Sequence, residues 1–106
     1  MAATYTEKRL ASGQVASSLT TVYTVPASTT ALLTQLWLYN TNTTAEEVTF
    51  AVNDGSDRIL ATLILEAGEY GIVELKGMAL NTGDLVKLGT DTASQVNYIL
   101  SGVEKA

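Results

Sequence analysis

The densest run of oxygen-bearing side chains is Asn-Asp-Gly-Ser-Asp at residues 53–57. Oxygen ligands at alternating positions are typical of calcium loops, which also require a bidentate glutamate at the twelfth position. Counting twelve from Asn53 or from the following aspartate reaches Ile64 or Leu65, and neither side chain binds calcium. Asn, Asp and Gly also tolerate the positive φ of tight hairpin turns. We therefore predict a turn here and no metal site.

The remaining acidic clusters are Glu46 with Glu47, Glu66 with Glu69, and Asp84. Glycoside chemistry needs two acids that face each other across a cleft, one of them with a raised pKa. These carboxylates lie in or beside predicted turns, where we expect solvent to surround them. The chain also lacks histidine and cysteine, which excludes Ser-His-Asp triads, thiolate nucleophiles and imidazole-based metal sites. We predict no catalytic residue, no metal ligand and no cofactor, hence a protein that is not an enzyme.

The aromatic residues offer a different chemistry, because aromatic faces can stack on sugar rings. Trp37 is accompanied by four candidate tyrosines, which are Tyr23, Tyr39, Tyr70 and Tyr98. Trp37 lies in the middle of the most apolar predicted strand, which favours a role in the core. A carbohydrate platform is the alternative.

The charge of the chain argues against nucleic acid as a partner. The net charge is −5, and only two of the six basic residues, Lys8 and Arg9, are adjacent, with Glu7 before them. Nucleic-acid binding usually requires a basic patch that displaces counterions from phosphates. The longest apolar stretch, residues 59–65, is interrupted by Thr62 and is far shorter than the roughly 20 residues of a membrane span. With no apolar signal run near the start, we expect a soluble protein made in the cytoplasm, with no membrane partner.

The elements that would position these residues are short strands. The 106 residues suit a single domain, and period-two alternation dominates from Leu19 onward. Turn signals recur every 8–12 residues and separate about seven to nine candidate strands, including residues 58–65. The sequence therefore predicts an all-β fold, a single antiparallel β-sandwich that is jelly-roll-like, over residues 19–106.

The longest candidate strand, residues 31–40, is apolar on both faces. Strict alternation places Leu32, Leu36 and Leu38 on one face and Leu33, Trp37 and Tyr39 on the other. A strand with two apolar faces is central in a sandwich or has one face pressed against a partner.

Residues 1–18 differ from the rest, being small and polar without periodicity. They are either a frayed terminus or an extended N-terminal arm that becomes ordered against a neighbouring subunit. For the arm we predict partner contacts through Tyr5, Arg9 and Leu10. The low charged fraction, 16%, and a surface rich in threonine favour burial against another protein, so the sequence indicates an assembly subunit.

Several short motifs resemble those of small virion proteins of tailed bacteriophages. They are Tyr-Thr-Val-Pro-Ala at 23–27, Thr-Thr-Ala at 29–31, Leu-x-Asn-Thr at 38–41, Ala-Gly-Glu at 67–69, Leu-Asn-x-Gly-Asp at 80–84 and the ending at 96–104. The resemblance covers roughly residues 9–104. It implies a β-sandwich component of the particle with no catalytic residues, and a capsid decoration (cement) protein of this kind is commonly a trimer on the outside of the shell.

We therefore expect a non-enzymatic structural protein on the capsid surface of a virion, where it binds and stabilises the shell. Its partners would be the major capsid protein or another virion protein, and further copies of itself, with a homotrimer favoured. The alternative is a module of the tail, neck or fibre that binds carbohydrate or a host receptor.

Overall fold

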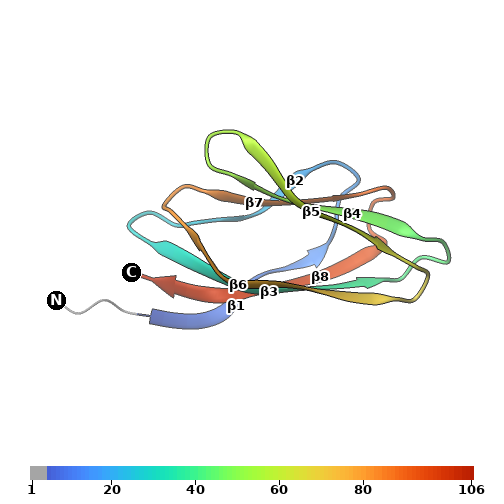
Figure 1. The fold of residues 1–106 in the computed structure, drawn as a ribbon, viewed down its shortest axis with the longest axis horizontal. Helices are drawn as coiled ribbons and strands as arrows, with labels where there is room; N and C mark the ends of the chain where they lie inside the picture. Colours follow the sequence, from blue (N-terminus) through green and yellow to red (C-terminus); the bar gives the residue numbers. More distant parts are fainter. Residues whose placement is uncertain (1–4) are drawn as a thin grey trace.

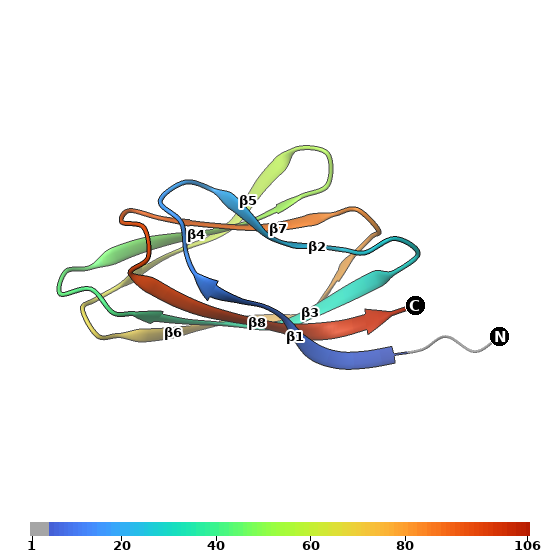
Figure 2. The same ribbon diagram turned by 180° about the vertical axis from the view of Figure 1, so that it is seen from behind.

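The fold is an eight-stranded sandwich, seen in a computed structural model that describes residues 5–106. Two antiparallel four-stranded sheets lie face to face, with orders β1-β8-β3-β6 and β2-β7-β4-β5 (Figures 1 and 2). The strands are β1 (Tyr5–Gln14), β2 (Thr20–Thr24), β3 (Thr30–Asn40), β4 (Glu46–Asn53), β5 (Asp57–Leu65), β6 (Tyr70–Leu80), β7 (Leu85–Thr90) and β8 (Val96–Lys105). The predicted all-β sandwich is confirmed.

The connections follow the jelly-roll pattern. Every link crosses from one sheet to the other, except the β4–β5 hairpin, which stays within one sheet. That hairpin closes at the predicted turn, where Asn53 pairs with Asp57 and Gly55 has a φ of 122°. The two inner faces enclose a single core of leucine and valine side chains around Phe50.

The N-terminal segment belongs to this sheet system over most of its length. The structure places Tyr5–Gln14 in edge strand β1, which pairs with β8 from Tyr5 opposite Lys105 to Gln14 opposite Asn97. Lys8 also donates to the carboxylate of Glu104 at 3.0 Å. The expected arm at residues 1–18 is therefore, from Tyr5 on, the first strand of the jelly roll, and residues 1–4 lie outside the described part. Because backbone groups make the pairing with β8, a strand can form there without side-chain alternation.

A β-bulge in β3 changes which side chains face the core. The register with both neighbouring strands shifts between Leu33 and Gln35. The extra residue reverses the alternation, so Leu33, Leu36 and Leu38 are all buried. Leu32, Trp37 and Tyr39 face outward instead. The predicted grouping of faces is wrong at Leu32 and Leu33, and so is the predicted core role of Trp37, which is 43% exposed.

Glu46 departs from the expectation of a solvated turn residue. Its side chain is buried at the start of β4, where it accepts hydrogen bonds from Asn42 Nδ2 at 3.0 Å, Thr90 Oγ1 at 3.1 Å and the Thr92 backbone N–H at 2.8 Å. Burial raises the pKa of this carboxyl, but the hydrogen bonds to Asn42, Thr92 and Thr90 outweigh it and hold the pKa below its ordinary value. The ionised carboxylate thus ties the loop after β3 to the loop after β7.

We expect Glu46→Gln to lower the free energy of unfolding at pH 7 by about 1–3 kcal/mol, because an amide cannot accept all three hydrogen bonds. A lowered folded pKa stabilises the protein above the ordinary value of 4.5, and this contribution disappears as the pH falls through the folded value. Urea unfolding at pH 7 and pH 3 should therefore show a smaller difference from wild type in acid. The exposed neighbour provides the control Glu47→Gln. An equal loss at both pH values would contradict this role.

Candidate functional site

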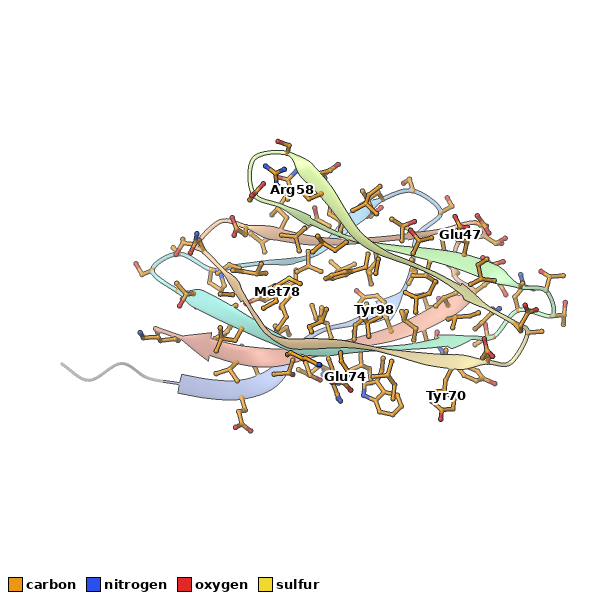
Figure 3. All side chains as sticks on the ribbon, viewed as in Figure 1. Glu47, Arg58, Tyr70, Glu74, Met78 and Tyr98 are labelled. Carbon is orange, nitrogen blue, oxygen red and sulfur yellow. The ribbon has the colours of Figure 1, made fainter. Side chains whose placement is uncertain are left out.

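The outer face of the β1-β8-β3-β6 sheet carries large apolar side chains that solvent reaches. Five of them adjoin one another over three strands and are called the aromatic face below: Trp37, Tyr39, Tyr70, Ile72 and Ile99. Their exposed fractions range from 37% to 63%. In Figure 3 the labelled Tyr70 points away from the other sheet, whereas Tyr98 and Met78 point into the interior.

Strand register brings these side chains together. Trp37 of β3 lies between Ile72 of β6 and Ile99 of β8, while Tyr39 lies opposite Tyr70. Directly opposite residues in antiparallel strands project from the same face, about 4.5–5.5 Å apart at Cβ. The Trp37 and Tyr70 rings stack diagonally, with centroids 6.1 Å apart and planes 20° apart.

A polar row borders the aromatic face on one side. The Trp37 indole N–H donates to Gln35 Oε1 at 3.2 Å, and Gln35 Nε2 donates to Glu74 Oε1 at 2.7 Å. These contacts satisfy the polar group of the indole and hold its ring in one orientation. Glu74 projects from the same side of the sheet as Tyr70 (Figure 3). The site therefore combines flat aromatic surface with an amide and a carboxylate at its border.

The three predicted contact residues lie apart from the aromatic rings. Arg9 is exposed on β1 opposite Ser101, in the same cross-strand row as Gln35. Leu10 packs against the core of its own chain. The backbone of Tyr5 pairs with β8, and its side chain lies outside the described residues.

The sequence offered Trp37, Tyr39 and Tyr70 for the alternative carbohydrate platform, together with Tyr23 and Tyr98, which the structure buries in the core. Sequence reasoning passed over Ile72 and Ile99 as part of a surface, although the two apolar faces of residues 31–40 pointed to a partner. Only strand register shows that they adjoin Trp37, and register comes from pairings far apart in the sequence. The sequence therefore contains no local signal that these residues form one surface, because their proximity depends on the tertiary structure.

Hollows also lie elsewhere on the described surface. One shallow hollow lies beside the polar row, between Glu7 and Ser101, and another lies on the opposite sheet, between Thr49 and Asp91. Residues 5–106 contain no group of three or more acidic, histidine or cysteine side chains that could hold a metal ion. Within the same range, no helix is long and apolar enough to cross a membrane.

Comparison with known proteins gives a likeness of fold. No family model matches the sequence, and no curated protein matches it. One similar structure is a chain of the disulfide-linked pili of Bacillus endospore appendages, with a TM-score of 0.58 and 13% identity over 98% of this chain and 89% of that one. Another is the GH26-CBM35 β-(1,4)-mannanase of Podospora anserina, with a TM-score of 0.43 and 12% identity over 98% of this chain and 27% of that one. The first likeness concerns the fold alone, and the second is too loose to support an argument.

Proposed function

We propose that this protein is a non-enzymatic structural protein of a phage virion, which binds the outside of the capsid as a decoration or cement protein. The observation that carries the proposal is the exposed aromatic face, with Trp37 at its centre. Soluble monomers rarely expose contiguous apolar patches of this kind, and such patches commonly mark interaction sites. The motif resemblance to small virion proteins supports the choice of particle and of the major capsid protein, or another virion protein, as the partner.

The composition of the face suits a protein partner. Its central row runs from Ser12 through Ile99 and Trp37 to Ile72 and contains no charged residue. Protein interfaces have such charge-poor centres, enriched in aromatic residues, with polar groups at the rim. Arg9, Gln35 and Glu74 would form that rim. The long axis of the sandwich would then lie against the shell, with the other sheet facing outward.

We expect Trp37→Ala to weaken binding to capsid shells about 30-fold, since a central tryptophan commonly contributes about 2 kcal/mol or more to an interface. The probe is a shell assembled from the major capsid protein encoded in the same genome, and binding is measured by co-sedimentation. Glu47→Ala, which alters an exposed side chain of the opposite sheet, should bind as wild type does (Figure 3). Circular dichroism verifies that both variants remain folded. Full binding by folded Trp37→Ala would refute the assignment of this face.

The same face supports a second candidate, a tail, neck or fibre module that binds carbohydrate or a host receptor. Exposed aromatic rings beside an amide and a carboxylate can stack on a pyranose and bond to its hydroxyls. Trp37 is the single tryptophan of the chain, so its fluorescence reports on this face alone. The test titrates the protein with host surface oligosaccharides. A saturable change in its fluorescence, together with no binding to capsid shells, would favour the second candidate over the first.

A further inference from the structure

The tip of the β4–β5 hairpin places an aspartate directly before a glycine. Asp54 with Gly55 is the one position in the sequence where an aspartate or asparagine precedes a glycine. An aspartyl side chain can close a ring with the backbone nitrogen of the next residue, and a glycine leaves that approach open because it has no Cβ. Ring closure therefore meets the least steric resistance in this chain at Asp54.

The structure exposes these two residues to solvent. Asp54, Gly55 and Ser56 are all exposed and lie between β4 and β5, outside the paired strands. A Cβ built at Gly55 would meet no atom within 4 Å, and the tip projects beyond the rest of its sheet (Figures 1 and 2). Exposed loop tips of this kind tolerate local changes in the backbone. The surroundings thus leave room for the backbone to rearrange at Gly55.

Two side chains of the same hairpin engage the groups that would react. The Gly55 N–H donates to Asn53 Oδ1 at 2.9 Å. The Nε of Arg58, at the tip in Figure 3, donates to both carboxylate oxygens of Asp54, at 2.9 and 3.1 Å. Ring closure needs a free nitrogen and a neutral acid whose hydroxyl group can leave, so both contacts must break first. Because an exposed ion pair contributes little free energy, the restraint that Arg58 imposes is partial.

We propose that Asp54 is a site of spontaneous isomerisation to isoaspartate, and that Arg58 restrains this reaction in the folded protein. The Gly55 nitrogen attacks Cγ of the neutral Asp54 side chain, and the acid's hydroxyl group leaves with the amide proton as water. Water then adds to the main-chain carbonyl carbon of the cyclic imide, and the bond from that carbon to nitrogen breaks. Gly55 remains attached through Cγ, while the former main-chain carbonyl becomes a free carboxylate. One water is lost and one is gained, so the mass is unchanged.

The product has a backbone that is longer by one methylene group at the tip of the hairpin. Its carboxylate is attached at Cα, so the present pairing with Arg58 is lost. The contact across the tip, where Asn53 Nδ2 donates to Asp57 Oδ1 at 2.7 Å, would also loosen. The aromatic face lies on the other sheet and is left unchanged. This modification therefore goes beyond the proposed function and does not depend on it.

Ageing of the full chain in warm, mildly acidic buffer tests the site. Isoaspartate is quantified with an isoaspartyl carboxyl methyltransferase and a labelled methyl donor, and peptide mapping locates it as a separately eluting isomer of unchanged mass. We expect the label at Asp54, whereas exposed Asp91, which precedes a threonine, should remain unlabelled. Asp54→Ser cannot form the ring and should also remain unlabelled. Labelling at Asp91 instead, or no label in the folded protein while a sample in urea acquires it, would overturn the proposal.

Arg58→Ala tests the restraint, and Lys87→Ala is the matched control. Lys87 of β7 pairs with Asp57 of the same hairpin at 2.9 Å, so its loss removes an ion pair but leaves the Asp54 pair in place. Isoaspartate should accumulate about threefold faster in Arg58→Ala, the factor that an exposed ion pair contributes, and at the wild-type rate in Lys87→Ala.

The same three proteins aged in urea separate this restraint from the intrinsic reactivity of the sequence. With the hairpin unfolded, all three should form isoaspartate at one rate. Urea unfolding curves verify beforehand that the variants are folded in buffer. A folded Arg58→Ala that ages no faster than wild type, an equal acceleration in Lys87→Ala, or a difference that persists in urea would overturn the role assigned to Arg58.

Discussion

Asn40→Asp is expected to lower the free energy of unfolding by about 3 kcal/mol or more. Asn40 is fully buried at the end of β3, and its Nδ2 donates to the carbonyl oxygens of Thr44, Leu65 and Glu66 at 2.9, 3.0 and 3.2 Å. Aspartate has nearly the same shape but offers only acceptors when ionised. Its carboxylate would face carbonyl oxygens, and each buried group left without a partner costs about 1–3 kcal/mol.

Equilibrium urea unfolding at pH 7 measures the loss, and Asn97→Asp supplies the control. Asn97 lies on neighbouring strand β8 with its side chain exposed, so the same chemical change should cost less than about 0.5 kcal/mol there. The comparison separates the hydrogen-bond pattern from the added charge. If both variants unfolded at the wild-type urea concentration, Asn40 would not hold the loops at this end of the sandwich as the structure shows.

Asn40 and Glu46 mark the limit of what the sequence could predict about polar residues. Both stand where a strand meets a polar loop, and the sequence predicted solvent around Glu46. Burial comes from loops that fold over them, because the donors to Glu46 include Thr90 and Thr92, more than 40 residues away. Residue type and local sequence pattern do not predict hydrogen-bond partners that lie so far away in the chain.

The apolar residues were predicted better, because alternation is a local signal. It correctly gave an all-β pattern of short strands and turns from Leu19 onward, including the hairpin around Gly55 and the strand that became β5. It failed at the bulge in β3, since a single extra residue reverses every later side chain and turned Trp37 outward. The candidate binding face thus depends on the β3 bulge, which the sequence pattern does not predict.

Gly102 illustrates the same limit in β8. This glycine lies inside β8, which continues to Lys105 with partners on both sides. A Cβ built at Gly102 would lie 2.5 Å from the backbone oxygen of Leu32 and 2.7 Å from Leu10 Cδ1. The glycine therefore lets β3 and the inward-packed Leu10 approach β8 closely. Close packing therefore requires a residue without a side chain at position 102, and the glycine does not end the strand.

We accordingly expect Gly102→Ala to cost about 3 kcal/mol, near the upper end of ordinary overpacking, because a backbone carbonyl held in a sheet cannot swing aside. Gly71→Ala is the matched control in edge strand β6. A Cβ there would lie 2.9 Å from Leu65 Cδ2, the end of a flexible side chain that can rotate away, so its cost should stay below about 1.5 kcal/mol. Urea unfolding of the two variants gives the comparison. Equal losses of unfolding free energy in the two variants would mean that the β3 backbone moves aside as readily as a leucine methyl group. The close approach of β3 to β8 would then not explain why residue 102 is a glycine.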